Sequence, residues 1–72
     1  MTDSMLLKSY IEKSGLKMSH IAQKMNISRA VLWRKINNLS AFNQYEIESL
    51  CEIIGIKTLK DRNAVFFAKN VD

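Results

Sequence analysis

The stretch GLKMSHIAQKMNISRAVLWRKINN, residues 15–38, contains the pattern from which the fold can be predicted. Its first apolar residues recur at helical spacing: Met18, Ile21, Ala22 and Met25. They predict a short helix with one buried face. Ser28 is a suitable N-cap for a second helix, SRAVLWRKIN, that follows at once. Because only Asn26 and Ile27 separate the two helices, the chain must turn sharply between them.

Two short helices joined by so short a turn form the helix-turn-helix arrangement. The turn needs a residue that tolerates left-handed backbone geometry, and asparagine is the best choice after glycine. Asn26 occupies this position, and Ala22, one turn earlier, is small enough for the second helix to cross close by. We therefore predict a helix-turn-helix over about residues 18–37.

Further helices are predicted on both sides of this pair. The segment SMLLKSYIEKSG, residues 4–15, has helical periodicity, Asp3 or Ser4 as an N-cap and Gly15 at its end. Residues 43–55, NQYEIESLCEIIG, begin with the capping box Asn43–Glu46 and end in a glycine.

The remaining chain predicts a short fifth helix from Thr58 and a C-terminal tail over about residues 64–72. Phe66 and Phe67 cannot both face the core of so small a domain, so one is expected to stay at the surface. The predicted fold is all-α, a compact bundle of four to five short helices that contains the helix-turn-helix. Residues 1–72 are interpreted as a single domain of this type.

The composition excludes several classes of protein. The chain of 72 residues has one cysteine, Cys51, which argues against a disulfide framework or a structural zinc site. It has no apolar run long enough to span a membrane, and a cytoplasmic location in a bacterial host is expected. No pair of nucleophile and base, paired carboxylates or glycine-rich phosphate loop is found. We expect no enzyme, cofactor, metal or small-molecule substrate.

The net charge of +4 is unevenly distributed. Residues 1–38 contain seven Lys or Arg residues against Asp3 and Glu12, a net of +5, whereas residues 39–72 have a net of −1. A basic half beside a nearly neutral half indicates a surface that meets a polyanion, with nucleic acid as the first candidate.

Residues 5 to 56 resemble the lambda-repressor-like, Cro-type helix-turn-helix family of phages and bacteria. The resemblance is carried by residues 15–38 and continues through FNQYEIESLCEIIGI, which is similar to that family's fourth helix. The length and the tail AVFFAKNVD are similar to those of the modulator-of-repression proteins of temperate lactococcal phages.

This resemblance implies that the third helix lies in the major groove of operator DNA, where a homodimer would place two such helices. At about 100° per residue, Leu32 and Ile36 point inward, while Ala30, Trp33, Arg34 and Asn37 share the outward face. Arg34 is the best candidate to bind a guanine edge, and Arg29 to bind a guanine or a phosphate. Lys35 and Lys24 are placed for contacts with the DNA backbone. The residues predicted to bind DNA or a protein partner are Lys17, Met18, Ser28, Arg29, Ala30, Trp33, Arg34, Asn37 and Asn38.

Departures from the family pattern leave a second function open. Lys17-Met18 replaces the usual Thr-Gln at the start of the second helix, and Asn26 and Asn38 replace glycines. Met18, Ala30 and Trp33 make the outward face more apolar than DNA binding requires, as in protein interfaces. The alternative is an antirepressor that binds the DNA-binding domain of a phage repressor through the same face. An antitoxin is a third possibility, although the nine-residue tail is short for binding a toxin.

Overall fold

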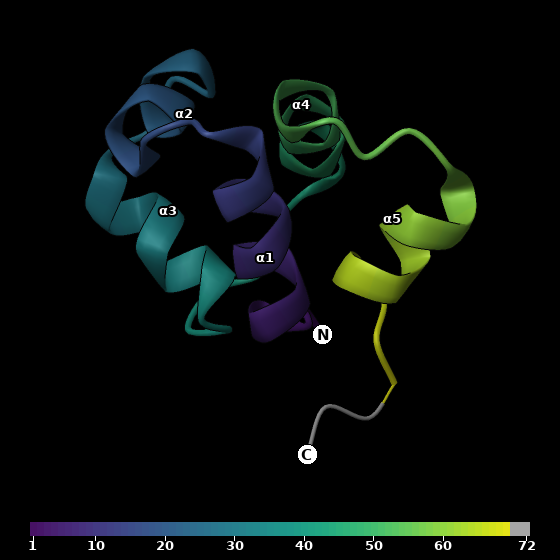
Figure 1. The fold of residues 1–72 in the computed structure, drawn as a ribbon. Coiled ribbons are helices and arrows are strands. Elements are labelled where there is room, and N and C mark those ends of the chain that lie inside the picture. Colours follow the sequence, from purple (N-terminus) through teal and green to yellow (C-terminus); the bar gives the residue numbers. More distant parts are fainter. Residues whose placement is uncertain (70–72) are drawn as a thin grey trace.

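The computed structural model of the protein describes residues 1–69, which form five helices and no strand. The helices are α1 (Ser4–Ser14), α2 (Met18–Lys24), α3 (Arg29–Ile36), α4 (Gln44–Ile54) and α5 (Leu59–Phe66). Figure 1 shows α1 in the middle, with α2 and α3 on one side and α4 and α5 on the other. Because α1 contacts α3, α4 and α5, it joins the two sides into one bundle. The predicted all-α bundle is confirmed, while residues 70–72 of the predicted tail lie outside the described part of the chain.

Local sequence accounts for the starts of four helices. In each of them an N-cap side chain accepts a hydrogen bond from a backbone N–H of the first turn, which satisfies a donor that the helix leaves free. These N-caps are Asp3, Ser28, Asn43 and Thr58. The capping box of α4 is complete, because Glu46 Oε1 also accepts a hydrogen bond from the Asn43 N–H at 2.8 Å. Helix α2 begins after Lys17 without a side-chain cap.

Residues with a left-handed backbone follow four of the five helices of residues 1–69. Gly15 and Gly55 end α1 and α4, as predicted, and asparagines do so after α2 and α3. The φ angle is +59° at Asn26 and +63° at Asn38. After Asn26 the N–H of Ile27 donates to the Ala22 carbonyl at 3.1 Å, the closing hydrogen bond of a Schellman motif. The predicted role of Asn26 in the turn is therefore confirmed.

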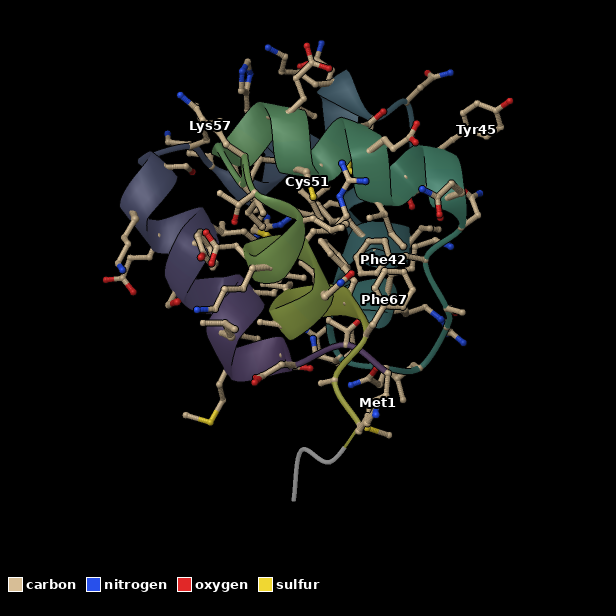
Figure 2. All side chains as sticks on the ribbon, turned by 90° about the vertical axis from the view of Figure 1, so that its right-hand side faces the viewer. Met1, Phe42, Tyr45, Cys51, Lys57 and Phe67 are labelled. Carbon is tan, nitrogen blue, oxygen red and sulfur yellow. The ribbon has the colours of Figure 1, made fainter. Side chains whose placement is uncertain are left out.

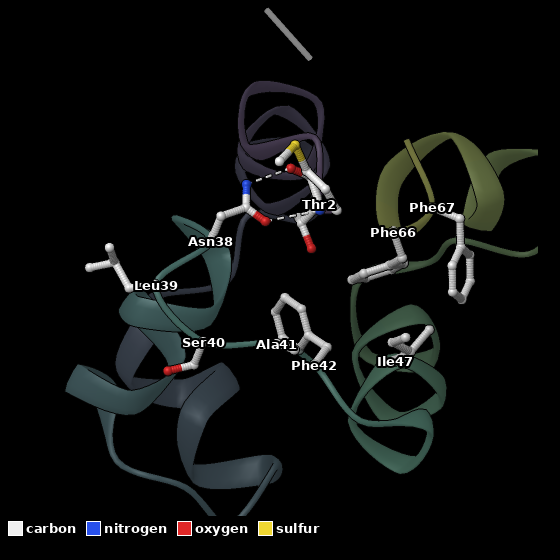
Figure 3. Close-up of a pocket in the computed structure, with 10 residues that line it drawn as sticks. Thr2, Asn38, Leu39, Ser40, Ala41, Phe42, Ile47, Phe66 and Phe67 are labelled. Atoms are coloured by element: carbon white, nitrogen blue, oxygen red, sulfur yellow. Dashed lines mark hydrogen bonds between the residues drawn. The ribbon is translucent and has the colours of Figure 1, made fainter. Parts of the chain in front are cut away.

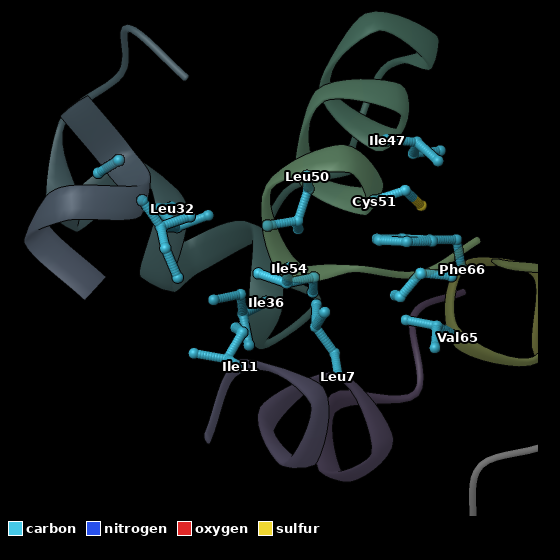
Figure 4. Close-up of a cluster of buried hydrophobic side chains, with 13 residues drawn as sticks. Leu7, Ile11, Leu32, Ile36, Ile47, Leu50, Cys51, Ile54, Val65 and Phe66 are labelled. Carbon is cyan, nitrogen blue, oxygen red and sulfur yellow. The ribbon is translucent and has the colours of Figure 1, made fainter. Parts of the chain in front are cut away.

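The core lies where apolar faces of all five helices meet (Figure 4). Its most deeply buried side chains are Leu7, Ile21, Leu32, Ile36, Leu50 and Val65. Phe66 is buried with them, and its ring packs edge-on against Phe42 with ring centroids 5.3 Å apart. Phe67 is 53% exposed and lies on the surface seen in Figure 2. The prediction that only one of the two adjacent phenylalanines enters the core is confirmed.

Cys51 is part of the same core. It lies on α4, faces α5, and is only 2% exposed. Burial raises the pKa of its thiol above the ordinary value, and the neighbouring Arg62 opposes this in part. A buried, protonated thiol behaves as a small apolar side chain.

The turn at Asn26 yields a first prediction. The substitution Asn26→Ala should lower the free energy of unfolding by about 1 kcal/mol, because alanine at positive φ brings Cβ close to the following carbonyl oxygen. Asn26→Gly should stay within about 0.5 kcal/mol of the unsubstituted protein, because glycine adopts this conformation without strain. Urea unfolding followed by circular dichroism measures both. Equal stability of the alanine and glycine variants would show that the turn does not need the left-handed conformation.

The burial of Cys51 yields a second prediction. The thiolate is the reactive form of cysteine, and here both burial and the raised pKa suppress its attack on a reagent. At pH 8 the native protein should therefore react with DTNB far more slowly than the same protein unfolded in urea. Absorbance at 412 nm gives both rates. A native rate close to that of free cysteine would contradict the burial of Cys51 in the core.

Candidate functional site

The helix-turn-helix is formed by α2, α3 and the four residues between them. The structure ends α2 at Lys24 and begins α3 at Arg29, so the connection has four residues and not two: it also includes Met25, which was predicted inside the helix, and the predicted N-cap Ser28. The difference arises because both residues act as caps: Met25 closes α2 and Ser28 Oγ accepts a hydrogen bond from the Val31 N–H at 3.1 Å. The predicted helix-turn-helix is confirmed, with short helices packed directly on each other.

Helix α3 has one face in the core and one at the surface. Leu32 and Ile36 are fully buried, as their predicted inward positions require. Trp33 is 53% exposed and Val31 is 38% exposed. The other exposed residues of the helix are Arg29, Ala30 and Arg34. The predicted phase of α3 is correct, and Val31 is an addition that sequence reasoning did not single out.

At the start of α2, Lys17 is exposed, whereas Met18 is half-buried and packs against the core. Met18 therefore adds less to the exposed face than its position in the sequence indicates. A shallow hollow of about 510 Å³ lies between α2 and the start of α3, and Ser19, Gln23 and Arg29 are among the residues that line it. Ser19 and Gln23 were not predicted as site residues, although their spacing of four places both on the polar face of α2.

The two asparagines after α3 hydrogen-bond within the protein. The Asn37 side chain donates to the Trp33 carbonyl at 2.9 Å and accepts from Lys8 Nζ at 3.0 Å. The Asn38 side chain accepts from the Thr2 N–H at 3.0 Å and donates to the Thr2 carbonyl at 2.7 Å. Both amides were predicted to face a ligand, and the structure shows them occupied by the protein's own groups.

The Lys35 ammonium is also occupied. It lies 3.1 Å from Glu46 Oε1 and donates to the Ala41 carbonyl at 2.9 Å, and its side chain is only 15% exposed. The ion pair ties α3 to the start of α4, and the contact of Lys35 with the DNA backbone stays a prediction. The sequence did not indicate the pair, since its members are on different helices.

The electrostatic character of the site follows from its position in the sequence. Residues 13–45 contain six Lys or Arg residues and no Asp or Glu. Apart from Lys35, none of these basic side chains forms a salt bridge within residues 1–69. The exposed basic residues of α2, α3 and their borders are Lys17, Lys24, Arg29 and Arg34. The surface of the helix-turn-helix is consequently positive, while the acidic residues Glu48, Glu52 and Asp61 are on α4 and α5.

Comparison with protein families gives a match that covers this site. A family model described as an HTH (helix-turn-helix) domain matches residues 4–57, which is about three quarters of the chain and includes α1 to α4. Comparisons with curated proteins and with solved structures give no match. No helix within residues 1–69 has the length and apolar character needed to cross a membrane. The match contains both α2 and α3 in full, and the chain belongs to the helix-turn-helix domain family.

Proposed function

We propose that the protein is a transcriptional regulator of a phage genetic switch that acts in the cytoplasm of the bacterial host and binds operator DNA through α3. The observation that carries the proposal is the exposed face of α3, which presents Arg29 and Arg34 on a helix-turn-helix surface without acidic residues. A helix placed in this way fits the major groove, and a positive surface attracts the phosphates on both sides of it.

Each exposed residue has a role that fits its chemistry. The guanidinium of Arg34 matches the two acceptors on the major-groove edge of guanine. Arg29 and Ser28 lie at the start of α3, where side chains and free backbone N–H groups meet phosphates. Lys17 and Lys24 are placed at the borders of α2 for further phosphate contacts. Ala30 and Trp33 offer apolar surface for a thymine methyl group or a sugar.

We propose that operator binding uses a homodimer, because one α3 helix of eight residues makes few contacts and a monomer would bind weakly. The domain measures 29 × 24 × 21 Å. Two copies of this size fit on half-sites whose centres lie about one DNA turn apart, roughly 34 Å, the spacing found in helix-turn-helix operators.

A further prediction follows for Arg34. The substitution Arg34→Ala should cost about 1–3 kcal/mol of binding free energy to DNA from the protein's own regulatory region and relax the preference for one base. Lys35→Ala, on the same helix, is the matched control: it removes an equal charge that is already paired, so its effect on affinity should be much smaller. Fluorescence anisotropy at several salt concentrations measures both. Equal losses for the two variants, or no salt-sensitive binding by the unsubstituted protein, would contradict operator binding.

A second candidate function is favoured by one observation, the exposure of Trp33 beside Ala30 and Val31. Tryptophan within an apolar surface is typical of the residues that dominate protein interfaces. In this case the protein is an antirepressor, and α3 covers the DNA-binding domain of the phage repressor.

The prediction for this alternative concerns Trp33→Ala. Loss of the indole should weaken repressor binding by about 2 kcal/mol or more, the loss expected of an interface hot spot. Calorimetric titration with the repressor domain measures the effect, and circular dichroism confirms that the variant is folded. Full retention of repressor binding by a folded Trp33→Ala variant would count against an antirepressor.

A further inference from the structure

The C-terminal end of α3 is held by the segment that precedes α1. Thr2 and Asn38 form two reciprocal hydrogen bonds, in which the Asn38 side chain pairs with both backbone polar groups of Thr2 (Figure 3). The Ser4 hydroxyl donates to the Ile36 carbonyl at 2.5 Å, so the last residue of α3 is bound as well. Thr2 is only 6% exposed, which shows that this segment is docked against the protein.

The same segment is attached to the end of α5. The Asp3 N–H donates to the Val65 carbonyl at 2.7 Å, and the Ala68 N–H donates to the Met1 carbonyl at 3.0 Å. Residues 1–3 therefore lie between the ends of α3 and α5 and hydrogen-bond to both. They link two helices that are far apart in the sequence.

Elsewhere α3 is held by its packing on α2, by the Lys35–Glu46 ion pair and by two side chains in the core. It has eight residues, and only Leu32 and Ile36 are fully buried. A helix of two turns has little stability of its own, so its orientation depends on tertiary contacts. The C-terminal end of α3 is closed by the N–H of Leu39, the residue after Asn38, which donates to the Arg34 carbonyl at 2.8 Å. Asn38 is therefore directly followed by a hydrogen bond to Arg34, the residue proposed to bind a base.

We propose that Asn38 and residues 1–3 form a clamp that positions α3 for its target, and that Asn38 acts through Thr2 and not by touching DNA. The effect of the clamp on DNA binding rests on the proposed function. Its effect on the stability of the C-terminal end of α3 does not depend on any ligand.

A double-substitution cycle tests the clamp. Asn38→Gly removes the amide and keeps the positive φ without strain, so the backbone is preserved. A chain that begins at Asp3, released from a cleavable fusion, removes the Thr2 partner. Each change should raise the hydrogen-exchange rate of the Leu39 amide about three- to tenfold and weaken DNA binding by a similar factor. Because both changes break the same pair of bonds, the combined variant should be no worse than the more affected single one.

Asn26→Gly is the matched control for the exchange measurement. It makes the same substitution at the same backbone conformation, in a helix-ending turn of the same kind, and among residues 1–69 no hydrogen bond uses the Asn26 side chain. Its exchange rates at the end of α3 should match those of the unsubstituted protein. Equal acceleration in this control would show that any asparagine-to-glycine change loosens α3, and would overturn the clamp.

The remaining outcomes also decide the proposal. Losses that add in the combined variant would mean that Asn38 and Thr2 act separately, which overturns it. The slope of log affinity against log salt should not change in Asn38→Gly, whereas a slope smaller by about one would assign Asn38 a phosphate contact and also overturn it. If the unsubstituted protein binds no DNA, the proposed function fails, and the exchange rates alone support or overturn the clamp.

Discussion

The left-handed backbone at Asn26 is the constraint on which the rest of the helix-turn-helix depends. It ends α2 and lets the Ile27 N–H return to the Ala22 carbonyl, so the chain leaves α2 in a fixed direction. That direction brings Leu32 into the core and therefore turns the opposite face of α3 outward. The chemistry available at the surface of α3 is thus determined three or more residues earlier, at Asn26, whose side chain contributes only its tolerance of positive φ.

Asn38 uses the same conformation for a different purpose. Glycine would satisfy the backbone at either position with less strain, as Gly15 and Gly55 do after α1 and α4. At Asn38 the side chain offers one acceptor and one donor to Thr2, and the gain from two hydrogen bonds offsets the cost of the left-handed conformation. The two asparagines look equivalent in the sequence, and only the three-dimensional structure separates them.

The features that sequence analysis predicted correctly are those that depend on near neighbours. Helix caps such as Ser28, the turn at Asn26 and the inward phase of Leu32 are determined within about four residues, so local pattern is sufficient. In contrast, Lys35 pairs with Glu46, which is 11 positions away, and Asn38 pairs with Thr2, which is 36 positions away. Such pairs cannot be predicted from the periodicity of the sequence, because they form only after the helices have packed. Sequence analysis therefore predicted the helix-turn-helix correctly but overestimated how many of its polar groups are free.

Fewer polar side chains are free in the folded protein than the sequence indicates, and a partner binds to those that remain free. Arg29 and Arg34 remain exposed and form no salt bridge within residues 1–69, and Trp33 adds apolar area on the same helix. Charge and apolar surface favour different partners. The arginines raise the affinity for DNA because their contacts with phosphates release counterions, whereas the indole raises the affinity for a protein when it is desolvated. The salt dependence of affinity separates the two contributions: operator binding must weaken steeply as salt rises, and an interface centred on Trp33 must not.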